Sequence, residues 1–464
     1  MNLFRNRLYF VLPLFAVSSA WGQVKSLTAR QAVDYALQNS PTIKNAVIET
    51  EISKAKVMET TAAGLPQISG SLSVLHYPQG NDPTKPNTQK FVLENQRGTP
   101  FYDTSGTEGS PIAFGLQLAN SLTGTLNATQ LIFNGSYLVG LQASKTYKEL
   151  TVKQLKQAKI TLAEQVMKTY YLILVNQEKT RLLDLNLLRL DSTFKETQVL
   201  FKNGFVEKID LDRIEVALNN LRSEKQKTTR LLVLATNGLK FQMGMPVKDS
   251  IELSENLNQV NPESILPADP TIDYNKRIEY STLQTQKQLA ALSLKNIKAG
   301  YLPSLVGLAT LGVNSAASKF GNLSNFSEKN RYAPYGYIGL SLSVPVFDGF
   351  QKKFQAQQAR LNINKLNNGF KQLENAIDLE LNQANINLAN ANTSLEIQKR
   401  NLKLAEEVVR VSKVKYRQGV GSNLEVTNSE SSLKESQSNY YSALYDFIIS
   451  KIDLDKAQGT LIAE

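Results

Sequence analysis

The chain repeats itself at a nearly constant spacing, and this repetition limits what it can fold into. The matching stretches are LIFNG at 131–135 with PVFDG at 345–349, FKNG at 201–204 with YRQG at 416–419, and Gly244 with Gly459. The offset is 214 residues between the two phenylalanines (347 − 133) and 215 for the other pairs (419 − 204 and 459 − 244). A constant offset over so long a stretch is typical of a duplicated unit. The sequence therefore predicts two copies of one long module, joined head to tail.

Each copy contains two segments in which apolar residues alternate with small or polar ones. Ile68 and Leu72 alternate with serines in the first copy, and Leu340 and Leu342 do so in the second. This period of two is typical of strands with one apolar face. The four predicted strands span about 66–76, 114–133, 303–314 and 335–347.

The predicted long helices carry apolar or small residues at alternating steps of four and three. In the second copy these residues are Ile377, Leu381, Ala384, Leu388, Ala391, Leu395, Gln398, Leu402, Ala405, Val409, Ser412 and Tyr416. The same phase survives subtraction of 215, at Leu183, Leu187, Leu190, Phe194, Thr197 and Phe201. Such heptad spacing predicts helices packed side by side along their length.

These helices are also unusually long. The segment between Gly349 and Gln418 contains no proline and only one internal glycine, Gly369. At about 1.5 Å per residue, a helix of that length would extend roughly 105 Å, about three times the ~30 Å hydrocarbon thickness of a bilayer. The sequence therefore predicts an elongated assembly.

Residues 1–22 have the pattern of a secretory signal peptide. Arg5 and Arg7 precede an apolar run at 8–16, and small residues around Trp21 precede a predicted cut before Gln23,. The alternative is an N-terminal membrane anchor, for which the apolar run is short. Removal of this segment would lower the formal charge from +11 to +9, because two arginines and no acids are lost.

The composition argues against an enzyme and against a nucleic-acid-binding protein. Lysines and arginines are scattered among acids along the helices, which predicts solvated faces. The single histidine, His76, lies at the end of a predicted strand, and the chain has no cysteine. No phosphate-binding loop, nucleophile elbow or metal-ligand cluster is found in the sequence. We therefore expect no catalytic residue, no cofactor and no metal.

An exported chain with strands and no apolar helix can cross a membrane as a closed β-barrel. Barrels of this class begin at about eight strands, so four strands per chain cannot close one. Either the strands are soluble or several chains share one barrel, and the sequence favours sharing because the alternating strands flank the long helices. The polar segments between the paired strands, at about 78–112 and 315–333, suit the external side, which would leave the helices in the periplasm,.

At this point the chain resembles the TolC-type outer-membrane efflux proteins over nearly the whole mature sequence. The stretches that carry the resemblance are Leu27-Thr28 through Ala32, Ala36-Leu37, Asn39-Ser40-Pro41, Gly64-Leu65-Pro66, Tyr301-Leu302-Pro303, Phe133-Asn134-Gly135, Phe347-Asp348-Gly349 and Tyr416-Arg417-Gln418-Gly419. Each motif alone is weak, but all of them in order, and several of them twice, form a specific pattern.

The resemblance implies an α+β membrane protein with an internal tandem repeat. Three chains would share a β-barrel of twelve strands, continued by a long periplasmic α-helical barrel. The segments would be a signal peptide at 1–22, a first repeat at 23–248, a linker at 249–271 and a second repeat at 272–464. Each repeat would contain a helix, two strands and a long helical hairpin.

The resemblance also implies a function and partners. The protein would be a passive exit duct in the outer membrane, surrounded by outer-membrane lipid, for a tripartite efflux or type I secretion system. It would act as a homotrimer that docks with a periplasmic adaptor and an inner-membrane transporter. The hairpin tips, near 202–207 and 417–423, are the expected docking sites. The competing class is an exported coiled-coil structural or adhesin protein. The cargo stays open, although few methionines and no cysteine disfavour a soft-metal path.

A gate is expected where the long helices turn back at glycines. In the family, acids after the second turn constrict the entrance and favour cations, and Glu425 matches the first of these acids. The next matching position holds Asn428 in place of an acid, which puts a second charged ring in doubt. The full set of expected gate residues is Gly204, Asp210, Asp212, Arg213, Tyr416, Gly419, Glu425 and Asn428. The alternative, ordinary capping of a helical turn, stays open for each.

Overall fold

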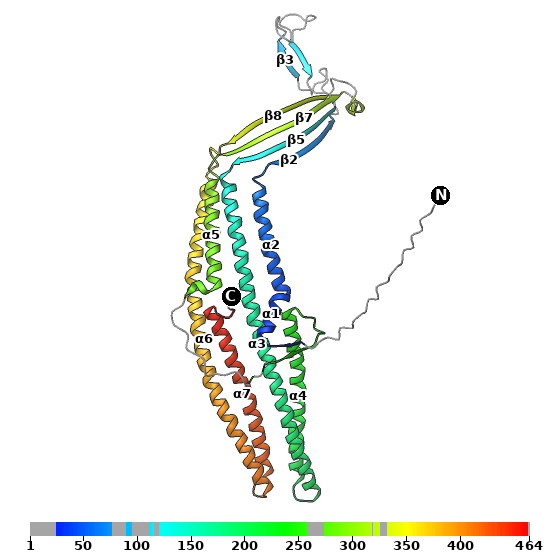
Figure 1. Ribbon diagram of the computed structural model, residues 1–464, viewed down its shortest axis with the longest axis vertical. Coiled ribbons are helices and arrows are strands. Elements are labelled where there is room, and N and C mark those ends of the chain that lie inside the picture. The colour runs from blue at the N-terminus through cyan, green and yellow to red at the C-terminus, as the bar shows by residue number, and fades with distance from the viewer. Residues whose placement is uncertain are drawn as a thin grey trace, which may run out of the picture. The chain divides into compact units, whose positions relative to one another are not determined.

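The computed structural model describes residues 25–76, 90–94, 111–115, 120–255, 257, 273–317, 319–324 and 332–462. In chain order the elements are β1 (Lys25–Leu27), α1 (Ala29–Asn39), α2 (Pro41–Ala62), β2 (Gln67–His76), β3 (Lys90–Glu94), β4 (Pro111–Gly115), β5 (Asn120–Phe133), α3 (Gly135–Lys202), α4 (Lys208–Met243), β6 (Ile251–Leu253), the 3-10 helix η3 (Tyr274–Lys276), α5 (Ile278–Ala299), β7 (Ser304–Ala317), the 3-10 helix η4 (Phe320–Ser324), β8 (Tyr332–Ser343), α6 (Gln351–Arg417) and α7 (Asn423–Gln458) (Figure 1). The predicted signal peptide lies outside the described residues.

The chain forms two compact units. The first, here called the helical unit, takes in the described residues of Met1–Glu49, Val152–Leu283 and Gly369–Glu464. The second, here called the sheet unit, takes in the described residues of Thr50–Thr151 and Gln284–Asn368. Helices α3 and α6 contribute residues to both units.

The sheet unit is built on a four-stranded antiparallel sheet with the order β2-β5-β7-β8. The two halves of the chain meet at its centre, where β5 pairs with β7 and Leu126 lies opposite Leu311 (Figure 1). A register shift near Leu131 and Phe133 marks a bulge at the end of β5,. Strands β2 and β8 are therefore the two edges of the sheet.

The apolar residues of the edge strands are exposed in the single chain. All residues of β2 are exposed, and Ile338 on β8 keeps 90% of its surface open. Leu72 and Leu340 are similarly uncovered. A sheet with an exposed apolar face and two unpaired edges is incomplete by itself in water, because such surfaces drive association.

The strands β2, β5, β7 and β8 lie where alternation predicts strands, with three differences. Strand β5 begins at Asn120, not at 114, and residues 116–119 lie outside the described part of the chain. Strand β8 ends at Ser343, because Pro345 cannot donate a ladder hydrogen bond,. The segment expected to be a polar loop contains a further two-stranded antiparallel sheet, β3 with β4. The rest of that segment, and 325–331 of the second predicted loop, lie outside the described residues.

The helical unit has an apolar core shared by α1, α3, α4, α6 and α7. Helix α1 begins with a reciprocal capping box, in which Thr28 and Gln31 each bond the other's backbone N–H,. The fully buried side chains of this core include Val166, Tyr170, Ile173, Leu239, Met243 and Phe447. The heptad seam predicted on α6 is confirmed, because Ile377, Leu381, Ala384, Leu388, Ala391, Leu395, Val409 and Ser412 are buried. On α3 the seam is less complete, since Phe201 is exposed.

The predicted linker at 249–271 contains a strand that the sequence did not indicate. Strand β6 pairs in parallel with β1, with Glu252 opposite Ser26. The buried Tyr170 hydroxyl donates to the Leu27 carbonyl at 2.8 Å, which ties this pair to α3. Most of the linker lies outside the described residues. Within the described ranges, no helix combines the length and the apolar character that a transmembrane span requires.

Candidate functional site

The helical unit ends in two hairpin turns, one joining α3 to α4 and one joining α6 to α7. Gly204 and Gly419 occupy these turns with φ of 78° and 74°. A Cβ built on either glycine would meet nothing within 4 Å. Glycine is therefore required here by the left-handed backbone and not by lack of space.

Both turns have the same hydrogen-bond pattern. The Gly204 N–H donates to the Phe201 carbonyl at 3.0 Å, and the Phe205 N–H donates to the Leu200 carbonyl at 2.9 Å. In the second turn, Gly419 donates to Tyr416 and Val420 donates to Lys415. This is a Schellman motif, which satisfies carbonyls that the helix end would otherwise leave free. Phe205 and Val420 follow the glycines and are both largely exposed.

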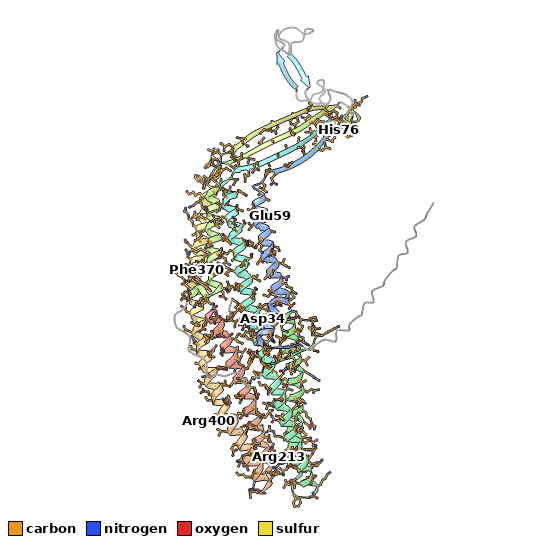
Figure 2. The ribbon with its side chains drawn as sticks, viewed as in Figure 1. Asp34, Glu59, His76, Arg213, Phe370 and Arg400 are labelled. Carbon is orange, nitrogen blue, oxygen red and sulfur yellow. The ribbon has the colours of Figure 1, made fainter. Side chains whose placement is uncertain are left out.

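The two turns lie side by side. The Asn423 side-chain amide, buried at the start of α7, donates to the Asp210 carbonyl of α4 at 3.4 Å. Figure 2 marks Arg213 on α4 near this end of the helical unit. The structure thus brings together in one chain the two tips that the sequence placed far apart.

Two of the expected gate acids, Glu425 and Asp210, have local cationic partners. Glu425 Oε1 lies 3.4 Å from Lys415 Nζ, across the α6–α7 turn. Asp210 lies 3.8 Å from Arg213, one turn later on α4. Asp212 is exposed on the same helix. Each tip therefore carries a paired acid close to its turn.

Two further expected gate residues, Tyr416 and Asn428, differ in burial. The Tyr416 hydroxyl is buried, and within the described part of the chain it has no hydrogen-bond partner. Asn428 is exposed and lines a cavity of about 290 Å³ between α3, α4 and α7. The Tyr416 hydroxyl thus forms no interhelical hydrogen bond with the described residues of this chain.

The structure reveals an ion-pair cluster near the tips that the sequence analysis missed. Glu430 on α7 lies 2.5 Å from Lys413 Nζ on α6 and 3.9 Å from Arg189 on α3. Arg189 also donates to Asn186 on its own helix. The signal that could have found it is a glutamate next to the buried stripe of α7, which includes Val426, Ser429 and Leu433.

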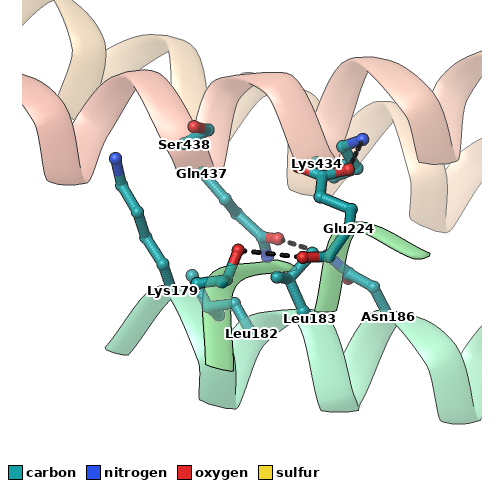
Figure 3. Close-up of a pocket in the computed structure, with 9 residues that line it drawn as sticks. Lys179, Leu182, Leu183, Asn186, Glu224, Lys434, Gln437 and Ser438 are labelled. Atoms are coloured by element: carbon teal, nitrogen blue, oxygen red, sulfur yellow. Dashed lines mark hydrogen bonds and ion pairs between the residues drawn. The ribbon is translucent and has the colours of Figure 1, made fainter. Parts of the chain in front are cut away.

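Further from the tips, polar side chains continue to link α3, α4 and α7. Asn186 donates to Gln437 at 3.0 Å, and Lys434 donates to Glu224 at 2.5 Å. Figure 3 shows these groups around a cavity of about 50 Å³. Lys179 also lines it, and burial lowers the pKa of its ammonium group.

Residues 162–175 and 441–457 contribute to the apolar core of the helical unit. Among these residues one charged group stands out, Glu164 on α3, which accepts from Lys168 at 2.8 Å and lies 2.9 Å from Lys456 on α7. Burial alone would raise the pKa of the Glu164 carboxyl, but hydrogen bonds from Lys168 and Lys456 hold that pKa below its usual value. The tip end thus combines polar contacts with buried apolar residues such as Ile214 and Leu433, and the other end has an apolar core.

In the part of the chain that the structure describes, no group of three or more His, Cys, Asp or Glu side chains is placed to hold a metal ion. His76 Nδ1 lies 2.7 Å from the Asn120 Oδ1, across the end of the β2–β5 pair. What the geometry defines is a pair of polar, charge-paired hairpin tips on a helical unit, in a chain that also forms an open sheet with an exposed apolar face. These features agree with the class of outer-membrane channel proteins that the sequence resembles.

The family comparison agrees with this class. The family described as outer membrane efflux protein matches residues 32–245 and 276–460. The chain belongs to this family. Its place is accordingly the outer membrane, with the helical part in the periplasm. Family members are channels and not enzymes, which agrees with the expectation from the sequence.

Individual proteins show the same similarity. Nodulation protein T of Rhizobium leguminosarum bv. trifolii is 21% identical over 434 residues, covering 89% of this chain and 82% of that protein. Outer membrane protein TolC of Escherichia coli (strain K12) is 20% identical over 204 residues, covering 42% of this chain and 41% of that protein. The CmeC outer membrane channel of Campylobacter jejuni has a similar fold, with a TM-score of 0.70 and 15% identity over 99% of this chain and 94% of that chain.

Proposed function

We propose that this protein is the outer-membrane exit duct of a tripartite efflux system and that it works as a homotrimer. The observation that carries the proposal is the four-stranded sheet, whose apolar residues and edge strands β2 and β8 are uncovered in one chain. Edge-to-edge pairing of three copies would give twelve strands, enough to close a barrel. The exposed apolar residues would then face lipid.

A second apolar stripe supports association of copies along the helices. On α6, one heptad seam is buried within the chain, but Leu379, Ile386, Ile397, Leu404 and Val411 remain exposed. Their spacings of 7, 11, 7 and 7 residues keep them on one face of the helix,. A neighbouring copy would cover this face in a helical barrel.

The tandem repeat is part of the proposal. We place the repeats at 23–248 and 272–464, joined by 249–271 and preceded by a signal peptide at 1–22. Support comes from the two separate stretches that match the family. Further support comes from the glycine pairs Gly204 with Gly419 and Gly244 with Gly459, which share a left-handed conformation at the same offset.

The paired hairpin tips are the proposed gate. Gly204 and Gly419 form the turns, Asp210, Asp212, Arg213 and Glu425 supply charge, and Tyr416 and Asn428 flank the turn regions. In a trimer, Glu425 would recur three times around the entrance and bias it toward cations. The exposed Phe205 and Val420 at the tips suit docking to a periplasmic adaptor that connects to an inner-membrane transporter,. Type I secretion is the second system that this architecture would serve.

Disulfide crosslinking between copies tests the shared barrel, because the natural chain has no cysteine. One cysteine is placed in β2 at Ser69 and one in β8, stepped through Gly339→Cys, Leu340→Cys and Ser341→Cys. We expect at least one pair to give covalent trimers under oxidising conditions in membranes. The matched control is Ser71→Cys with Thr125→Cys, whose hydroxyls lie 2.7 Å apart within one chain and whose disulfide would leave monomers. Monomers from every β2–β8 pair would contradict the proposal.

A further inference from the structure

Glu425 has a cationic neighbour, Lys415, that the family resemblance does not include. Lys415 Nζ lies 3.4 Å from Glu425 Oε1, and the two side chains are 50% and 43% exposed. The pair spans the α6–α7 turn, with Lys415 before the turn and Glu425 after it. The acid expected to charge the entrance is therefore accompanied by a positive charge from its own chain.

The backbone on both sides of this pair is held by hydrogen bonds. The Lys415 carbonyl accepts from the Val420 N–H at 3.1 Å and from the Gly421 N–H at 3.2 Å. A Cβ built on Gly421 would lie 2.9 Å from the Lys415 Cβ, so the turn closes tightly on this residue. At the other side, the Glu425 N–H donates to the N-cap Ser422 Oγ at 3.1 Å,. The two side chains thus start from fixed positions that face each other across the turn.

The equivalent acid of the first hairpin is compensated in another way. Subtracting 215 from Glu425 gives Asp210, and subtracting 215 from Lys415 gives Leu200, which carries no charge. Asp210 is instead paired with Arg213, at 3.8 Å. The position equivalent to Arg213 is Asn428 (213 + 215), which is neutral. The two tips therefore neutralise equivalent acids with cations from different positions.

We propose that Lys415 sets the charge selectivity of the tunnel entrance by neutralising Glu425. This inference rests on the proposed function, because it needs the tips to form an entrance. An exposed ion pair contributes little to stability. We therefore expect Lys415 to act on the electric field that passing ions meet within a Debye length of the pair. Three copies would place three lysines beside three glutamates. The entrance then repels anions only weakly. It therefore admits cargo that is zwitterionic or carries a net negative charge.

Reversal potentials across a planar lipid bilayer, measured in a KCl gradient, test this inference. We expect Lys415→Gln to raise the cation-to-anion permeability ratio on the order of two- to five-fold, because three positive charges leave the entrance. Glu425→Gln is expected to lower the ratio, and the double variant to return close to the wild-type value. Lys415→Arg keeps the charge and should keep the ratio.

The matched control is Lys403→Gln, which removes the same charge from an exposed position on α6, twelve residues earlier (415 − 403). It should leave the ratio unchanged, and thermal unfolding of all variants should match the wild type. A ratio that shifts for Glu425→Gln but not for Lys415→Gln would overturn the inference and leave the duct in place. A wild-type protein that carries no current would instead reject the proposed function itself.

Discussion

Glu430 on α7 and Lys413 on α6 form a contact of 2.5 Å in which only 12% of the glutamate side chain is exposed. Arg189 approaches the same carboxylate from α3 at 3.9 Å, so one acid connects three helices. Glu425, five residues earlier, is 43% exposed and makes one contact across a turn. The two glutamates differ in burial and in number of partners, and they should differ in what their removal costs.

We predict that Glu430→Ala destabilises the helical unit by about 1–3 kcal/mol, because it leaves Lys413 and Arg189 without their shared partner. Urea unfolding in detergent, followed by circular dichroism, measures this change. Glu425→Ala is the matched control and should cost less than about 1 kcal/mol. Equal effects of the two substitutions would contradict the assigned difference in burial.

We predict that alanine substitution costs more stability at Gly244 than at Gly204. At Gly204 the added Cβ meets no neighbour, so Gly204→Ala should cost about 1–2 kcal/mol from the left-handed backbone alone,. At Gly244 the backbone is also left-handed, and a Cβ would approach the Asn39 carbonyl oxygen to 2.6 Å. Gly244→Ala should therefore be clearly more destabilising, because it also displaces α1.

The same unfolding measurement compares these two glycine variants. Hydrogen exchange locates the damage, with faster exchange expected in α1 for Gly244→Ala and only near the α3–α4 turn for Gly204→Ala. A cost for Gly204→Ala as large as that for Gly244→Ala would show that the tip is more tightly packed than the structure has it.

The pH dependence of stability should include a contribution from Glu164. Its folded pKa is below its ordinary value of 4.5, so its stabilisation is present above that value and is lost as the pH falls through the folded pKa,. We predict that Glu164→Gln lowers stability at pH 7 by about 1–3 kcal/mol, because two charge-assisted hydrogen bonds are weakened. The deficit should shrink as the pH falls below about 4.5 toward pH 3.

Thermal unfolding of wild type and Glu164→Gln, measured at half-unit steps from pH 7 to pH 3, gives this difference directly. Lys456→Met offers a second view, since it removes one of the two donors and should reproduce part of the deficit at pH 7. A gap between wild type and Glu164→Gln that stays constant down to pH 3 would contradict the assignment.

Elements that follow from the spacing of nearby residues could be predicted from the sequence. Contacts between residues far apart in the sequence could not. The seam on α6 follows from residue spacing alone, and Gly419 follows from the need for a left-handed residue at a helix end. The β1–β6 pair places Ser26 opposite Glu252, and the sequence around either residue does not indicate the other. Strands β3 and β4 escaped notice because each is a run of only five residues.

The candidate site shows the same division. The sequence placed Glu425 after its turn, and the resemblance proposed its role. The sequence did not predict that Lys415 lies opposite Glu425, because the two residues are ten positions apart and their contact depends on how the turn folds back. Glu430 was missed because its partners come from two other helices, which only the packed structure brings together.

Conductance of the purified wild-type protein tests the central claim most directly, that copies of this chain share one hollow duct. The protein, extracted in detergent and sized by light scattering, is added to a planar lipid bilayer under voltage. The account predicts a mass of three chains and discrete steps of ionic current. A monodisperse particle with the mass of one chain, 51.5 kDa before removal of the predicted signal peptide, that produces no current would contradict it.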